Sequence, residues 1–270
     1  MTPVWVNGRL VAPDDATVPA LDHGITVGDG VFETMRTYDG VPFALDRHLA
    51  RLARSAAGLG LTPPPVDVLE RAVGKVIAAS AMAECRVRLT VTAGAGPLGS
   101  GRVDGACTIV AAVAPLEPVP PVTDVITVPW VRNERSPLAG LKTTSYADNV
   151  VALARAKDAG ASEALFANTR DELCEGTGTN VFVVIDGRLL TPPLSSGCLA
   201  GVTRELVLEC TGAVEETLPY DVLFTADEVF LTSTTREVQA VAHVDEHAVP
   251  QAPGPVTLAA AEAFRSIRSP

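Results

Sequence analysis

Lys142 is the residue whose type and surroundings most clearly suggest chemistry. It lies in the segment AGLKTTSYADN, after an apolar run and before three hydroxyl residues, in a chain with 18 arginines and only three lysines. A lysine beside apolar residues can have a lowered pKa, and its neutral amine is then a nucleophile that forms Schiff bases with carbonyl groups. Pyridoxal phosphate is the commonest carbonyl cofactor held in this way. Lys142 is therefore a candidate Schiff-base lysine, although a lone lysine more often only extends its charge into solvent.

A pyridoxal phosphate site also needs an acid beside the pyridine nitrogen and donors for the phosphate. Glu175, in CEGTGTN, follows an apolar strand and precedes a turn rich in glycine and threonine. In LAGVTRELV, residues 199–207, a glycine and a threonine open an expected helix, whose N–H groups and dipole favour an anion. Hydroxyl residues also gather in LTSTTREV, residues 231–238. Each stretch alone can be a plain turn or helix cap, so the prediction rests on their combination.

Hydrophobic patterns predict strands and helices in alternation, as in an α/β protein. Hairpins are expected where apolar residues alternate around Asn7-Gly8, Asp39-Gly40 and Asp186-Gly187. Helices are expected over residues 46–58, 66–81, 147–160, 201–213 and 257–267, and further strands over residues 85–94, 106–116, 162–168 and 228–234.

A proline-rich segment, APLEPVPPV, interrupts this alternation near the middle of the chain. It lacks helical spacing, and its prolines favour extended backbone. The sequence therefore predicts a small amino-terminal α/β domain over residues 1–114 and a linker over residues 115–122. A larger cofactor-binding domain is expected over residues 123–270.

The bulk composition argues against several classes of protein. A net charge of −11 without a basic stripe argues against nucleic-acid binding. We find no signal-peptide pattern and no apolar run that could span a bilayer, so we expect a cytoplasmic protein. Five cysteines without a CxxC pair indicate reduced thiols. His243 and His247 lie four apart, but their segment is polar and ends in proline, so no metal site is predicted.

The order and spacing of these stretches resemble a known family between Asp22 and Val238. The chain is similar to the class IV aminotransferases, which are fold-type IV pyridoxal phosphate enzymes. The family includes branched-chain and D-amino acid aminotransferases, (R)-selective amine transaminases and aminodeoxychorismate lyase. The matching segments are DHGITVGDGVFET, RHLARLARSA, GLKTTSYADN, EALFANTRDELCEGTGTNVFVV, LLTPPLSSGCLAGVTRELV and LTSTTREV. The resemblance implies two α/β domains with the cofactor between them.

The resemblance also implies roles for individual residues. Lys142 would form the Schiff base and move the proton, Glu175 would contact the pyridine nitrogen, and Arg51 would bind the phosphate. Tyr146 would contact the phenolic oxygen of the cofactor, although branched-chain enzymes place their tyrosine one residue later. The other expected cofactor contacts are Leu199, Val202, Thr203 and Thr234. The residues expected on the substrate side are Phe32, Glu33, Leu98, Thr235 and Arg236.

The loop AGAGPLGSGR departs from the familiar D-amino acid aminotransferases. Those enzymes carry an Arg-x-His there that holds the substrate carboxylate, whereas this chain has Leu98 and Ser100 at the matching positions. If the substrate has a carboxylate, a cation elsewhere in the chain must bind it. Arg236 is the favoured candidate, because it follows three hydroxyl residues where relatives usually have a small residue. The other candidates are Arg86, Arg88 and Arg102.

From this resemblance we expect a transaminase that acts on D-amino acids, with (R)-amines as further donors and a 2-oxo acid as the acceptor. One alternative is aminodeoxychorismate lyase, which releases pyruvate and 4-aminobenzoate, and another is a branched-chain L-amino acid aminotransferase. A non-catalytic pyridoxal phosphate carrier is disfavoured, because the matched catalytic positions are intact. The resemblance further implies a homodimer in which both subunits build each site.

Overall fold

A computed structural model describes residues 2–103, 105 and 107–268 of the chain. These residues form two compact units. The first unit comprises Met1–Glu117 together with Leu141–Tyr146, and the second comprises Pro118–Gly140 together with Ala147–Pro270. The boundaries expected from the sequence place residues 141–146 in the second domain, whereas these residues pack with the first unit.

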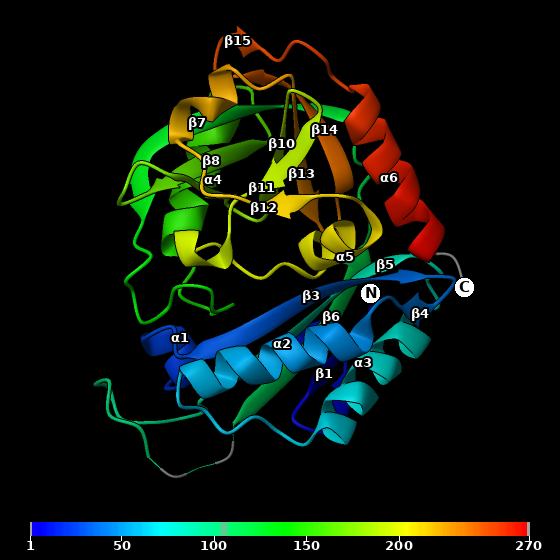
Figure 1. Ribbon diagram of the computed structural model, residues 1–270. Coiled ribbons are helices and arrows are strands. Elements are labelled where there is room, and N and C mark those ends of the chain that lie inside the picture. The colour runs from blue at the N-terminus through cyan, green and yellow to red at the C-terminus, as the bar shows by residue number, and fades with distance from the viewer. Residues whose placement is uncertain (1, 104, 106, 269–270) are drawn as a thin grey trace. The chain divides into compact units, whose positions relative to one another are not determined.

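The first unit is a mainly antiparallel sheet with two long helices on one face (Figure 1). Its strands lie in the order β2-β1-β6-β5-β3-β4. Their bounds are β1 Val4–Val6, β2 Arg9–Val11, β3 Gly30–Tyr38, β4 Val41–Pro42, β5 Cys85–Thr92 and β6 Thr108–Pro115. The helices are the short η1 Pro13–Asp15 and α1 His23–Thr26, and the longer α2 Leu45–Gly58 and α3 Val66–Ser80.

Alternation along the central strands decides which side chains the helices cover. Val87 and Leu89 of β5 are fully buried in one apolar cluster with Leu52 of α2 and Val73 of α3. Successive side chains of a strand point to opposite faces. Arg86 and Arg88 therefore lie on the face of the sheet that α2 and α3 do not cover.

The second unit is a mixed sheet in the order β12-β11-β10-β13-β14-β7-β8-β9, with β15 paired to β14. Helix α4 contacts β7 and β8, and helices α5 and α6 contact β13 and β14. The strands are β7 Val122–Arg132, β8 Glu163–Asn168, β9 Leu173–Gly176, β10 Asn180–Ile185, β11 Arg188–Thr191, β12 Val214–Glu215, β13 Glu228–Ser233, β14 Glu237–Val244 and β15 His247–Ala248. The helices are α4 Ala147–Asp158, η2 Leu194–Ser196, α5 Val202–Cys210, η3 Tyr220–Phe224 and α6 Pro255–Arg268.

The expected hairpins and long helices are confirmed, with ends that differ by a few residues. Both residues of each expected turn, Asn7-Gly8, Asp39-Gly40 and Asp186-Gly187, have positive φ angles. Such angles match the turns that join two strands through two residues. The patterns did not predict β7, β9 or β14. Strand β7 lies between β14 and β8, so its partners are distant in sequence.

Candidate functional site

The backbone around Lys142 is attached to the start of β3. The Phe32 N–H donates to the Lys142 carbonyl at 3.1 Å, and the Thr144 N–H donates to the Gly30 carbonyl at 2.8 Å. On the other side, the Lys142 N–H donates to Oγ of Ser55, on α2, at 3.1 Å. Lys142 is thus held in its segment by contacts with both a strand and a helix.

Three of the expected residues meet around one aromatic ring. Nζ of Lys142 lies 4.3 Å from the ring centroid of Phe32 and 5.9 Å from that of Tyr146. The two rings meet edge to face, with their centroids 5.3 Å apart. Cζ of Arg88 lies 3.7 Å from the same Phe32 centroid. The Phe32 ring therefore lies in contact with both the Lys142 amine and the Arg88 guanidinium, which come from segments on opposite edges of β3.

Arg88 is a cation without a carboxylate partner among the residues that the structure describes. Partial desolvation lowers its pKa, the charge of Tyr146 opposes this, and the charge of Arg86 adds to it. A guanidinium keeps its charge at any ordinary pH even so. A partly desolvated guanidinium that lacks a fixed counter-ion is well suited to bind an anionic ligand.

Glu33 and Arg51 form a buried ion pair inside the first unit. Nε and Nη2 of Arg51 donate to the two carboxylate oxygens of Glu33 at 2.8 and 2.6 Å, and Nδ1 of His48 lies 2.7 Å from Oε2. Burial alone would raise the pKa of Glu33, but the charge of Arg51 and the hydrogen bonds from Arg51 and His48 lower it to about 2. Glu33 was expected on the substrate side, and the structure instead places it beneath α2 as the carboxylate that orients Arg51.

In the second unit, Glu175 is fixed through both carboxylate oxygens. Oε2 accepts a hydrogen bond from the Leu199 N–H at 2.9 Å, and Oε1 lies 3.2 Å from Nε of Arg132. The sequence did not single out Arg132, which lies at the far end of a strand that was itself not expected. The Glu175 carboxylate is thus held between the Arg132 guanidinium and a backbone N–H group.

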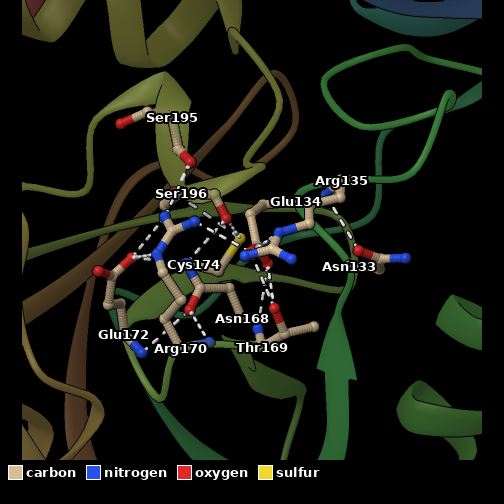
Figure 2. Close-up of polar contacts among 10 residues, drawn as sticks. All are labelled: Asn133, Glu134, Arg135, Asn168, Thr169, Arg170, Glu172, Cys174, Ser195 and Ser196. Carbon is tan, nitrogen blue, oxygen red and sulfur yellow. Dashed lines mark hydrogen bonds and ion pairs between the residues drawn. The ribbon is translucent and has the colours of Figure 1, made fainter.

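An ionic clamp ties together the loops that precede Glu175 and Leu199. Figure 2 shows Arg170 between two carboxylates, with Nη1 2.9 Å from Glu134 and Nη2 2.7 Å from Glu172. The same Nη2 donates to the Ser195 carbonyl at 3.1 Å. The Glu134 side chain is almost fully buried. Through its contact with Ser195, Arg170 joins the turn between β8 and β9 to the loop that leads to α5.

The start of α5 has the form expected of an anion site. Gly201 is its N-cap residue, and no side chain among the described residues caps the helix. A Cβ on Gly201 would overlap Oδ1 of Asn180, so a glycine is needed there. Val202 and Thr203 are buried in the first turn, where backbone N–H groups have no partner within the helix. Thr234 and Thr235 are half-buried between β13 and β14.

Arg236, the favoured carboxylate binder, is engaged inside the second unit. Nη1 donates to Oγ of Ser162 and Oε1 of Gln239 at 2.9 and 2.5 Å, and Nη2 donates to the Ser162 carbonyl at 2.8 Å. Its guanidinium therefore ties β14 to the start of β8.

Arg102, a candidate carboxylate binder, and Leu98, expected on the substrate side, both lie in the loop after β5. Arg102 makes a bidentate pair with Asp29, with both N–O distances 2.6 Å. Leu98 is 78% exposed and carries no charge. Arg86 and Arg88 therefore remain as the candidate carboxylate binders.

Two structural residues escaped the sequence analysis because their partners are distant in sequence. Ser55 accepts the Lys142 N–H, 87 positions away. Glu163 is buried and accepts from the Thr177 and Gly178 N–H groups at 3.0 and 3.3 Å and from the Thr177 hydroxyl, so it fixes the turn after Glu175.

The sequence also predicts reduced cysteines, no metal site and no membrane-spanning segment. All five cysteines are free, and burial raises the pKa of Cys198 to about 11, with Glu175 adding to the effect. Among the described residues, no three histidine, cysteine or acidic side chains group as metal ligands would. No helix in the described part of the chain has the length and apolarity to cross a membrane.

Comparison with known proteins places the chain among relatives along its whole length. Residues 30–244 match the family described as amino-transferase class IV. A "Putative branched-chain-amino-acid aminotransferase" of Methanocaldococcus jannaschii is 35% identical over 98% of this chain and 96% of its own. A D-alanine aminotransferase of Bacillus licheniformis is 32% identical over 94% of this chain and 93% of its own.

Solved structures agree with this match. The branched-chain aminotransferase of Thermoproteus uzoniensis, solved with norvaline, superposes with a TM-score of 0.92 at 30% identity, over 98% of this chain and 94% of its own. Similar structures with bound pyridoxal or pyridoxamine phosphate are also found.

Proposed function

This chain belongs to the class IV aminotransferases, which use pyridoxal phosphate, and we propose that its reactive amine is Nζ of Lys142. The bound cofactor supplies the electron sink that makes the α-proton of an amino acid acidic. Lys142 would take this proton on Nζ and return it to the C4′ carbon of the cofactor. An amino donor and a 2-oxo acid are the two substrates of such an enzyme.

The residues of the second unit fit the chemistry of this cofactor. Glu175 is a fixed carboxylate that would contact the ring nitrogen, and Leu199 lies beside it through its own N–H group. The uncapped start of α5 would receive the phosphate through the N–H groups of Val202 and Thr203. We further propose that Thr203 and Thr234 donate from their hydroxyls.

Two residues of the first unit complete the proposed set of cofactor contacts. Arg51 is proposed as a phosphate contact, with its guanidinium oriented by Glu33. Tyr146 is proposed beside the phenolic oxygen of the cofactor, since its ring lies near both Lys142 and Phe32.

The observation that supports an amino acid substrate is the placement of Arg88 and Lys142 on one ring. Both cationic groups lie within 4.3 Å of the Phe32 centroid. We propose that a donor whose α-carbon lies at Lys142 extends its carboxylate along the Phe32 ring to the Arg88 guanidinium. Simple amines would lose this contact, so we propose Arg88 instead of Arg236 as the carboxylate partner.

We propose L-amino acids with branched aliphatic side chains as the donors. The support is the higher identity to a protein named as a branched-chain enzyme, together with the missing charges at Leu98 and Ser100. The sequence alone favoured D-amino acids over branched-chain L-amino acids as donors, so this proposal reverses that preference. D-amino acids, with (R)-amines as an extension, are the second candidate, because the D-alanine aminotransferase also matches over nearly the whole chain.

The visible spectrum of the cofactor-loaded protein separates these candidates. L-leucine and D-alanine are added separately, without any oxo acid, so that one half of the reaction is followed as the loss of the visible absorbance. Loss with L-leucine and not with D-alanine is expected. The opposite pattern would support the D-amino acid candidate. If neither compound acts, release of 4-aminobenzoate from aminodeoxychorismate becomes the next assay.

A further inference from the structure

Helix α2 contacts the backbone of Lys142 through a buried hydroxyl. Ser55 is 1% exposed, and its Oγ accepts the Lys142 N–H at 3.1 Å. On the carbonyl side of the same residue, the Phe32 N–H donates at 3.1 Å. The two peptide groups that flank the Lys142 side chain are therefore fixed from opposite directions, by α2 and by β3.

A second contact joins α2 to the residue before the lysine. A Cβ placed on Gly58 would lie 2.6 and 2.8 Å from the two methyl carbons of Leu141. Carbon atoms do not approach so closely without displacement of one of them. Gly58 lies three positions after Ser55, so the two residues share one face of the helix. We call this pair the Ser55–Gly58 notch.

We propose that the Ser55–Gly58 notch is a positioning element for Lys142, an inference that rests on the proposed role of this lysine. Gly58 admits the Leu141 side chain, and Ser55 sets the position of the next peptide group. Together they determine where Nζ stands relative to the Phe32 ring, from which it lies 4.3 Å. A misplacement of about 1 Å can reduce the rate of an enzymatic reaction by about a hundredfold.

The first test compares Gly58→Ala with the same change in the neighbouring helix. A Cβ added to Gly74, inside α3, would meet no atom within 4 Å, so Gly74→Ala is the matched control. We expect Gly58→Ala to lower kcat about ten- to a hundredfold with a smaller change in KM. Gly74→Ala should leave both constants unchanged. In the Gly58→Ala background, Leu141→Ala should restore kcat in part, because it removes the overlapping methyl groups.

The second test measures how the reactivity of the Lys142 amine depends on pH in the absence of the cofactor. Reductive methylation of the apoprotein, followed by mass spectrometry across a pH series, gives the pH profile of this one amine. We expect Gly58→Ala and Ser55→Ala to shift the midpoint of that profile. Ser80→Ala is the control, since Ser80 Oγ also accepts a backbone N–H, from Met82 at 3.2 Å, at the end of α3.

The outcomes separate positioning from simple stability and from the proposed function. If both notch variants lower only the unfolding temperature, with the wild-type pH profile and kcat, the notch is structural and the inference is wrong. If Gly58→Ala does not fold, Ser55→Ala still decides, because it removes one oxygen atom without adding bulk. Lys142→Ala tests the proposed function itself. If that variant retains turnover, Lys142 is not the reactive amine, whatever the labelling profile shows.

Discussion

Replacement of Arg88 with methionine tests the proposed carboxylate contact. The change keeps most of the side-chain length and removes the guanidinium that lies 3.7 Å from the Phe32 centroid. A hydrogen bond to a charged group contributes about 1.5–3 kcal/mol. Since about 1.4 kcal/mol corresponds to a tenfold change in rate, kcat/KM for L-leucine should fall about ten- to a hundredfold. The lost contact with the ring should cost only about 0.5–1 kcal/mol of stability.

The assay compares L-leucine with isopentylamine, the same chain without the carboxylate. If Arg88 binds the carboxylate, Arg88→Met lowers kcat/KM for the amino acid and leaves that for the amine nearly unchanged. Arg86→Met is the matched control, because Arg86 lies on the same face of β5 and has no ring contact among the described residues. Equal losses for both substrates, or an unchanged value for L-leucine, would refute the assignment. A loss with Arg86→Met alone would move the role to Arg86.

Two further predictions concern buried carboxylates. Glu33→Gln should lower the free energy of unfolding at neutral pH by about 3–5 kcal/mol, because it removes the carboxylate charge that faces the buried Arg51 guanidinium. The pKa of Glu33 falls from 4.5 to about 2 on folding, so its stabilisation is complete above pH 4.5 and is lost as the pH falls toward 2. Urea unfolding at several pH values checks both statements, and a wild-type-like midpoint would contradict them. Glu163→Gln should cost about 2–3 kcal/mol and weaken cofactor binding, because the turn at Thr177 loses its charged acceptor. Unchanged cofactor affinity would show that this turn does not position Glu175.

Local patterns were enough to predict the hairpins and long helices. An Asn-Gly or Asp-Gly pair between alternating residues requires positive φ angles at both turn positions, and the three expected turns have them. The apolar spacing of α2 likewise predicts the face that packs in the core. Strands β7 and β14 escaped prediction because parallel pairing joins residues more than a hundred positions apart. No window of sequence contains that information.

The direction of a side chain was harder to predict than its place along the chain. Phe32 and Glu33 were both expected on the substrate side, yet neighbours on a strand point to opposite faces. That rule alone could have separated them. The structure places Glu33 beneath α2 with Arg51, and it places the Phe32 ring beside Lys142. The aromatic residue is therefore the one that fits the proposed substrate contacts.

The four candidate arginines show why the carboxylate partner could not be chosen from spacing. A guanidinium is available to a ligand only when the fold leaves its N–H donors without acceptors in the protein, and this depends on residues far away in sequence. Arg236 is engaged by Ser162, 74 positions away, and Arg102 by Asp29, 73 positions away. Arg88 has no such partner among the described residues, and it is exposed on the face of β5 that the helices leave open. The unsatisfied cation, together with its place on the Phe32 ring, is the physical reason for expecting a substrate that brings its own carboxylate.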